Sequence, residues 1–136
     1  MSDQEAIDRL FERWKRAVAE RDIEAICKLV TEDAEFWTHG QPALTGRDAI
    51  RAALSSFWAL AHHRQEFTRH ELVVSGDLAF ARGLEHNQIR MLSGGQERLV
   101  VQRAFMVMRR DSDGEWRFSR GMTNLPPQEQ PAITTG

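Results

Sequence analysis

Tyrosine is absent from this chain of 136 residues, and cysteine occurs only once, at Cys27. A single cysteine excludes a disulfide framework within the chain and any zinc site built from several thiolates. No apolar run approaches the roughly twenty residues that a membrane-spanning helix needs. The first residues also lack the basic start and apolar core of a signal peptide. We therefore expect a cytoplasmic protein with no membrane partner, in which Cys27 packs as a small apolar side chain.

A strong excess of either charge is missing as well. The chain carries 18 Lys and Arg residues against 20 Asp and Glu residues, which gives a formal net charge of −2. It contains no block of basic residues, so we expect no nucleic-acid partner. The length fits one domain, which should bury about two-thirds of its unfolded surface and can enclose a small pocket.

Apolar residues recur at three- and four-residue steps in three segments of the first half of the chain. The first segment follows a capping box formed by Ser2 and Glu5, and the second, shorter one follows Asp22. The third follows a second capping box, formed by Thr45 and Asp48, and reaches the pair His62–His63. We expect both histidines in the last turn of this helix, where a cation interacts favourably with the helix dipole.

The rest of the chain has the pattern of strands. A short strand is expected over residues 34–39, and four apolar runs separated by glycine-containing turns follow residue 65. The two middle runs are long and Gly83 offers a bend, so the sheet should curve. The sequence thus predicts an α+β fold, a cone-shaped, curved antiparallel sheet wrapped around three N-terminal helices, in one domain over residues 1–125. Residues 126–136, polar and rich in proline, are expected to form a flexible tail.

Four segments resemble the nuclear-transport-factor-2-like superfamily, which includes ketosteroid isomerases, SnoaL-like polyketide cyclases, scytalone dehydratase and limonene-epoxide hydrolase. They are WKRAVAERD from Trp14, ICKLVTEDAEF from Ile26, LTGRDAIRAAL from Leu44 and RRDSDGEWRF from Arg109. The resemblance implies a cystatin-like α+β barrel with a pocket for a small molecule. It implies the fold more strongly than the chemistry, because one fold hosts many functions.

The resemblance also implies where catalytic groups would stand. In the isomerases a tyrosine of the first helix and a strand acid form an oxyanion hole, and an aspartate moves the proton. Here the tyrosine position falls on Trp14, the base position falls near Thr38 or His39, and the second acid falls near Phe105. The Arg-x-Asp pair of the epoxide hydrolases would begin at Arg103 and lacks its acid. Neither mechanism can operate in its usual form.

Two residues are our candidates for catalysis. His39 precedes a Gly-Pro turn near the expected mouth of the cone and could act as acid and base. The alternative is a histidine at a strand end that bonds to the turn. Strict alternation places Arg120 on the face of Trp116 and Phe118, towards the interior. A guanidinium there needs a carboxylate partner such as Glu85 or Glu71, water at the mouth, or an anionic ligand.

The remaining candidate residues would form the wall of the pocket. Either Arg103 or Arg120 could hold an oxyanion or carboxylate of the ligand. The full set of expected ligand-binding residues is Trp14, Phe36, Trp58, Arg103, Phe105, Met122 and Asn124. The alternative for the aromatic and methionine members is an ordinary place in the core. Together they favour an apolar or weakly acidic small molecule. No Glu-x-x-His or His-x-His spacing indicates a metal site, and no cofactor is expected.

The run over residues 97–110 is apolar on both faces. Helices can cover only one face of the sheet, so we expect the other to bind a second copy of the chain as a homodimer. We place Met106 on that outer face. Two hypotheses about function remain open at this point. One is an isomerase-, cyclase- or dehydratase-type enzyme that transfers a proton on an apolar carbonyl compound. The other is a non-catalytic, dimeric ligand-binding or protein-interaction module.

Overall fold

A computed structural model describes residues 1–127, so most of the expected tail lies outside the described residues. The structure has three helices and six strands within this range. In chain order they are α1 (Asp3–Glu20), α2 (Ile23–Lys28), β1 (Val30–Trp37), β2 (Leu44–Thr45), α3 (Arg47–Leu60), β3 (Ala61–Ser75), β4 (Leu78–Met91), β5 (Arg98–Arg110) and β6 (Trp116–Asn124). The α+β fold predicted from the sequence is confirmed.

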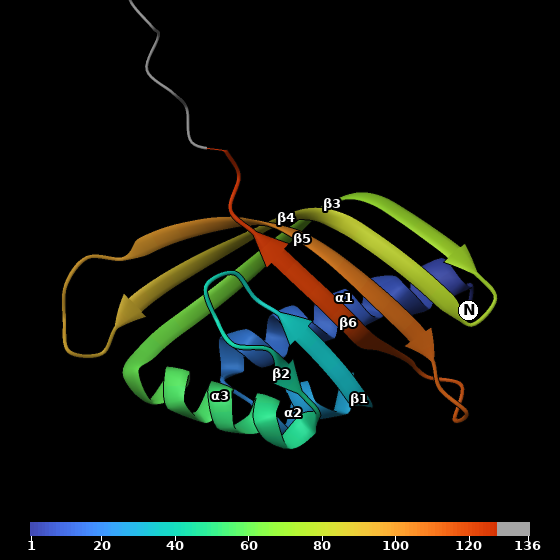
Figure 1. The fold of residues 1–136 in the computed structure, drawn as a ribbon, viewed down its shortest axis with the longest axis horizontal. Helices are drawn as coiled ribbons and strands as arrows, with labels where there is room; N and C mark the ends of the chain where they lie inside the picture. The colour runs from blue at the N-terminus through green and yellow to red at the C-terminus, as the bar shows by residue number, and fades with distance from the viewer. Residues whose placement is uncertain (128–136) are drawn as a thin grey trace, which may run out of the picture.

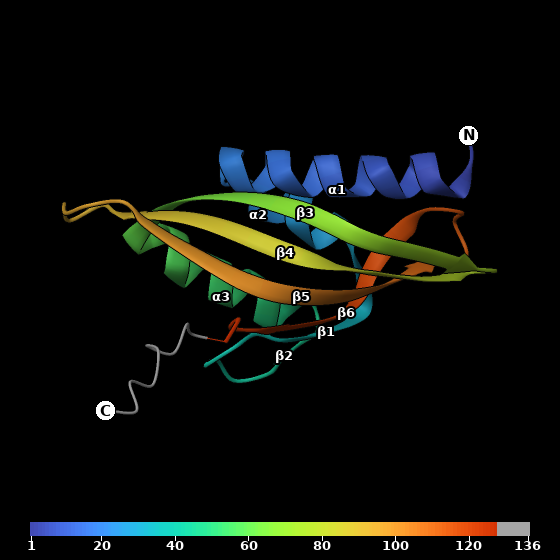
Figure 2. The ribbon, with the colours of Figure 1, turned by 90° about the horizontal axis from the view of Figure 1, so that it is seen from above.

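The strands form one curved, open sheet in the order β2-β1-β6-β5-β4-β3. The sheet arches over the helices, with α3 beneath its concave side (Figure 1) and α1 running alongside β3 (Figure 2). Neighbouring strands are antiparallel except β1 and β6, which run parallel. The expectation of a purely antiparallel sheet is therefore wrong at this one pair.

The starts of α1 and α2 follow the local signals in the sequence. The hydroxyl of Ser2 accepts a hydrogen bond from the Glu5 amide at 3.1 Å, and the carboxylate of Asp22 accepts one from the Ala25 amide at 3.0 Å. The capping box expected from Thr45 and Asp48 is wrong, because Gly46 precedes α3 and the helix has no side-chain cap. The helix also ends at Leu60 rather than at the histidine pair. His62 and His63 belong to β3, so their expected place in a helical turn is wrong.

The core fills the space between the helices and the concave face of the sheet. Its most deeply buried large side chains are Ile7, Leu10, Ile26, Val30, Thr31 and Met108. Cys27 lies in α2 and is 3% exposed, as expected for a small apolar side chain. Burial raises the pKa of its thiol, which disfavours the reactive thiolate.

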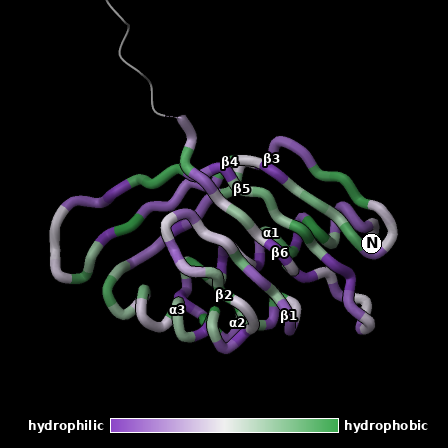
Figure 3. The backbone as a smooth tube through the Cα atoms, in the orientation of Figure 1, coloured by the Kyte–Doolittle hydropathy of each residue, from purple (hydrophilic) through white to green (hydrophobic). Residues whose placement is uncertain are grey.

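Two irregularities bend the long strands. A Cβ atom on Gly83 would stand only 2.1 Å from the backbone oxygen of Thr68, so this position of β4 tolerates no side chain. On the facing strand the register shifts between Arg69 and Glu71, which leaves one extra residue in β3. The irregularity expected at Gly83 therefore lies in the facing strand, as a bulge of β3 opposite this glycine. Hydrophobic and hydrophilic residues occur along these strands in short stretches (Figure 3), whereas burial alternates from one residue to the next along most of β3.

A second bulge lies in β6 and decides which side chains face the interior. Phe118 pairs with Met108, but Arg120 pairs with Val107, so Ser119 is the extra residue. Ser119 is buried, and its hydroxyl lies 3.3 Å from that of Thr31. Beyond this bulge the alternation of β6 is reversed.

Candidate ligand cavity

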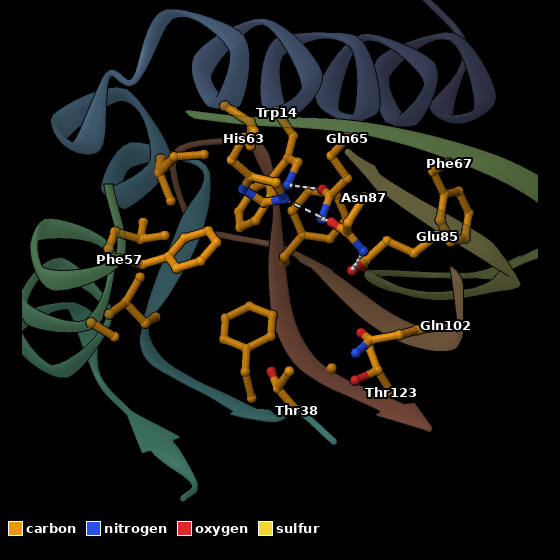
Figure 4. Close-up of a pocket in the computed structure, with 18 of the residues that line it drawn as sticks. Trp14, Thr38, Phe57, His63, Gln65, Phe67, Glu85, Asn87, Gln102 and Thr123 are labelled. Carbon is orange, nitrogen blue, oxygen red and sulfur yellow. Dashed lines mark hydrogen bonds between the residues drawn. The ribbon is translucent and has the colours of Figure 1, made fainter. Parts of the chain in front are cut away.

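A cavity of about 640 Å³ lies between the concave face of the sheet and helices α1 and α3. Its volume is within the usual range of small-molecule sites. Side chains of α3 and neighbouring elements form an apolar wall, which includes Trp14, Phe36, Leu54, Phe57 and Trp58 (Figure 4). Three of the expected wall residues, Trp14, Phe36 and Trp58, therefore line the cavity.

The opposite wall is polar and belongs to β3, β4 and β5. Alternation along β3 directs His63, Gln65 and Phe67 inward, and alternation along β4 does the same for Glu85 and Asn87. The antiparallel register brings these residues together, because Gln65 pairs with Asn87 and Phe67 pairs with Glu85. On the next strand Gln102 pairs with Glu85 and also lines the cavity.

A network of hydrogen bonds joins Trp14 to the side chains of this polar wall (Figure 4). The indole of Trp14 donates to Oε1 of Gln65 at 2.6 Å, and Nε2 of Gln65 donates to Oδ1 of Asn87 at 3.0 Å. Nε2 of His63 lies 2.8 Å from the same Asn87 oxygen. Nδ2 of Asn87 then donates to Oε1 of Glu85 at 2.9 Å. The result is a connected network that ends on a carboxyl group.

His63 is held in its neutral form. The indole of Trp58 donates to Nδ1 of His63 at 3.4 Å, so the proton of the ring lies on Nε2, which donates to Asn87. Burial lowers the pKa of His63, and the hydrogen bond to Asn87 opposes this only in part. The imidazole therefore contributes a neutral N–H group to the network rather than a positive charge.

The pKa of Glu85 is raised, whereas that of His63 is lowered. Burial raises the pKa of its carboxyl group, although hydrogen bonds from Asn87 and Gln65 lower it. A carboxyl group whose pKa moves towards neutrality can both release and take up a proton near physiological pH. Within the cavity, Glu85 is the group best suited to acid–base chemistry.

The mouth of the cavity is formed by the turn after β1 and by the end of β6. His39 lies in this turn, exposed, and its backbone amide donates to the hydroxyl of Thr123 at 3.0 Å. The backbone rather than the imidazole makes this bond, and the residue borders the cavity. Met122 is 49% exposed and reaches the cavity only at its edge.

The other four expected site residues do not line the cavity. The guanidinium of Arg120 donates to the backbone oxygen of Asp33 at 2.7 Å and lies 3.5 Å from its carboxylate. Arg103 donates to the side-chain oxygen of Asn124 at 2.6 Å. Arg120 and Asn124 lie on the outer face because the Ser119 bulge reverses the alternation of β6, and Arg103 of β5 lies on the same face as its register partner Asn124. Their expected inward orientation is wrong.

The orientation of β5 also differs from the prediction. Phe105 is 45% exposed on the outer face, where its ring stacks on that of Phe80 at 5.3 Å. Met106, which we placed on the outer face, instead lines the cavity. Both faces of β5 are apolar, so its hydropathy alone carried no information about direction.

A family model described as SnoaL-like domain matches residues 11–118. This match covers the second half of α1, helices α2 and α3, and the residues of the polar network. The chain belongs to the SnoaL-like domain family. The resemblance to the nuclear-transport-factor-2-like superfamily inferred from the sequence is thereby confirmed. No curated protein matches the chain.

Solved structures place this SnoaL-like domain among proteins of the same fold. A conserved protein from Planctomyces limnophilus is 28% identical with a TM-score of 0.83, over 90% of this chain and 94% of the other. An NTF2-like protein with a cystatin-like fold from Novosphingobium aromaticivorans is 26% identical with a TM-score of 0.78, over 93% and 84%. A ketosteroid isomerase-like protein from Erwinia carotovora is 21% identical with a TM-score of 0.79, over 90% and 96%.

Two further findings concern the described part of this SnoaL-like domain. Residues 1–127 contain no group of three or more His, Cys, Asp and Glu side chains arranged to hold a metal ion. Within the same range, none of the helices combines the length and the apolar character needed to cross a membrane.

Sequence reasoning missed His63, Gln65 and Asn87, and it considered Glu85 only as a partner for Arg120. The missing information was the end of α3. Once β3 begins at Ala61, simple alternation directs His63, Gln65 and Phe67 to one face. The signal was therefore present in the sequence, but it depended on a boundary that the sequence left open.

Proposed function

We propose that this SnoaL-like domain is an isomerase-, cyclase- or dehydratase-type enzyme that transfers a proton on an apolar carbonyl compound. The observation that carries the proposal is the carboxyl group of Glu85, with its raised pKa, at the polar wall of an otherwise apolar cavity. The proposal requires no cofactor. The ligand is an apolar or weakly acidic small molecule, bound against Trp14, Phe36 and Trp58.

In the proposed reaction, Glu85 removes one proton from the substrate and returns it to the same molecule. The carboxylate of Glu85 removes a proton from the carbon next to the carbonyl group, and the electron pair of that C–H bond passes to the carbonyl oxygen. The protonated carboxyl then returns the proton to a carbon of the enolate, at the same or a conjugated position. A carboxyl group whose pKa is raised by burial suits both steps.

His39 keeps a place in this proposal at the mouth of the cavity. An exposed histidine there can exchange protons between the ligand and solvent. The proposal gives Arg120 no catalytic role, because its guanidinium is engaged with Asp33 on the other face of the sheet.

The test is proton exchange on a simple ketone. The α-protons of 2-tetralone are followed by NMR in deuterated buffer with the wild-type protein and with Glu85→Gln. We expect the wild type to accelerate exchange and Glu85→Gln to lose about 100-fold or more of that acceleration. Glu66→Gln is the matched control, because Glu66 borders the same cavity but is exposed and paired with Lys15 at 2.6 Å.

Two outcomes would count against the enzyme proposal. Equal exchange rates with wild type and Glu85→Gln would remove Glu85 from the chemistry. Binding of 2-tetralone to the wild type without any accelerated exchange would favour the second candidate function, a non-catalytic ligand-binding module. Thermal shift with 2-tetralone measures that binding independently of turnover.

We also propose that two copies associate through the outer face of the sheet. An apolar patch of Trp37, Phe80, Phe105, Val107 and Met122 supports this proposal, with three of its members about half exposed. The charges beside it are already paired within the chain, as in Arg82 with Glu71 at 2.7 Å. Such a surface favours an equally apolar partner, and a second copy supplies one. A cytoplasmic location, which we propose, fits the buried free thiol of Cys27.

A further inference from the structure

The hydrogen bonds that lead from Trp14 to Glu85 all point the same way, and Trp14 fixes which atom of each amide donates and which accepts. The indole nitrogen of Trp14 can only donate a hydrogen bond. The side-chain oxygen of Gln65 must therefore face Trp14, at 2.6 Å, and its amide nitrogen must face the other way. That nitrogen donates to Oδ1 of Asn87 at 3.0 Å. A group outside the polar wall thus sets the orientation of the first amide.

The orientation of Asn87 follows from that of Gln65. The oxygen of Asn87 receives the donors of Gln65 and His63, so its nitrogen faces the carboxyl group of Glu85 and the backbone oxygen of Val100. Reversal of this amide would set its nitrogen against the N–H groups of its neighbours. It would also present an oxygen to Glu85, which only a protonated carboxyl could satisfy.

We infer that Trp14 is a positioning residue that sets the proton affinity of Glu85 through the amides of Gln65 and Asn87. An N–H group aimed at a carboxyl stabilises its ionised form, and an oxygen aimed at it stabilises the protonated form. With Trp14 in place, the two amides offer N–H groups to Glu85 and hold its pKa below the value that burial alone would impose. The inference rests on the proposed function only in naming Glu85 as the acid–base group.

Trp14 is the stronger of two such anchors. Trp58 fixes the tautomer of His63 in the same way, but its indole nitrogen lies 3.4 Å from the imidazole, against 2.6 Å for Trp14 and Gln65. The route from Trp14 also passes through amides alone, which do not titrate. Its effect on Glu85 therefore persists over the whole pH range in which the protein is folded.

Other titratable groups border the cavity and must be followed in the same experiment. His63 of β3 belongs to the network itself. Lys15 of α1 and Glu66 of β3 form an ion pair at 2.6 Å, and Glu12 of α1 and His39 of the mouth are exposed. The causes of the pKa shift of Glu85 are burial and its two amide neighbours rather than any of these groups.

The test measures the titration of the Glu85 carboxyl by ¹³C NMR and needs no turnover. The proteins compared are the wild type, Trp14→Phe, Gln65→Leu and the double variant. We expect Trp14→Phe to raise the pKa of Glu85 by about 0.5–1 pH unit, the effect of weakening one neutral hydrogen bond. Because Trp14 acts through Gln65, the same substitution should add no shift in the Gln65→Leu background.

The control separates this role from simple packing. A phenylalanine at position 14 keeps the aromatic contact with Phe118, whose ring centroid lies 5.2 Å from that of Trp14. Trp37→Phe removes an equivalent indole bond, to Glu35 on the outer face, and should leave the Glu85 titration unchanged. If Trp14→Phe does not fold, Gln65→Leu tests the next link of the network and should raise the same pKa.

Two results would overturn the inference. One is a Glu85 titration that Trp14→Phe leaves unchanged, and the other is an equal shift in the presence and absence of the Gln65 side chain. Failure of the proposed function has a different signature, namely a wild-type Glu85 that titrates as an ordinary exposed acid, or ketone exchange that survives Glu85→Gln. Each idea can therefore fail while the other stands.

Discussion

Gly121 of β6 lies directly beneath the aromatic ring of Phe36 of β1. A Cβ atom at position 121 would stand 2.6 Å from Cδ1 of Phe36 and 3.0 Å from the sulfur of Met106. Both neighbours line the cavity, so the absence of a side chain at Gly121 lets the Phe36 ring lie close against the sheet. A side chain at position 121 would have to displace the Phe36 ring or the Met106 side chain and would so change the width of the cavity at this point.

A valine at position 121 should therefore narrow the cavity. We expect Gly121→Val to push the Phe36 ring inward, to weaken binding of bicyclic 2-tetralone more than binding of cyclohexanone, and to destabilise the fold by about 1–3 kcal/mol through overpacking. Thermal shift with each ketone measures this preference. The double variant with Phe36→Leu should recover much of the loss, and equal weakening for both ketones would contradict the explanation.

The lowered pKa of His63 predicts how stability depends on pH. The folded protein holds His63 neutral, whereas in the unfolded chain its pKa is near 6.5. As the pH falls below 6.5, the unfolded chain takes up this proton more readily, so the free energy of unfolding decreases by at most about 1.4 kcal/mol per pH unit. The stability that comes from keeping His63 neutral is fully present above pH 6.5. It is lost as the pH falls from 6.5 towards the lower pKa of His63 in the folded protein.

Urea unfolding at pH 7.5 and pH 5.5 checks this prediction. His63→Gln should show a smaller loss of stability between the two values than the wild type. His70→Gln serves as the control because that histidine is exposed. Asp33 does not interfere in this range, since hydrogen bonds from Arg109 and Thr31 lower its pKa to about 2. Identical losses for wild type and His63→Gln would count against a neutral, buried imidazole.

The proposed contact between copies can be tested at Phe105. Phe105→Asp places a charge in the outer apolar patch and should shift sedimentation towards the monomer without changing the thermal shift given by 2-tetralone. Leu60→Asp is a matched control, because Leu60 is 60% exposed at the end of α3, away from this patch. A dimer that survives Phe105→Asp would show that the contact lies elsewhere.

Local signals made the helices predictable. Ser2 and Asp22 act on amides three residues away, so their role can be recognised without any knowledge of the rest of the chain. The end of α3 had no such signal, because Leu60 is followed by Ala61 rather than by a glycine or proline. This single boundary decided whether His63 was a helix-end cation or part of the cavity.

Sequence patterns could not predict which side chains of β5 and β6 point into the cavity, for a different reason. An extra residue such as Ser119 moves every later side chain of its strand to the opposite face, and the cost of accommodating it depends on distant neighbours such as Thr31. Trp14, Phe36 and Trp58, the three predicted wall residues that line the cavity, precede this bulge in the chain and did not depend on its register. The orientation of Arg120 did depend on it, and its predicted inward orientation was wrong.

The parallel pairing of β1 with β6 has a consequence for how the protein is made. On the ribosome, β1 emerges early, yet one of its two sheet neighbours, β6, is the last of the described strands to be synthesised. Until then the apolar faces of α1, α2 and β1 have no complete sheet to cover them, and such distant pairing slows folding. The sheet can therefore be completed only after residue 124 has left the exit tunnel.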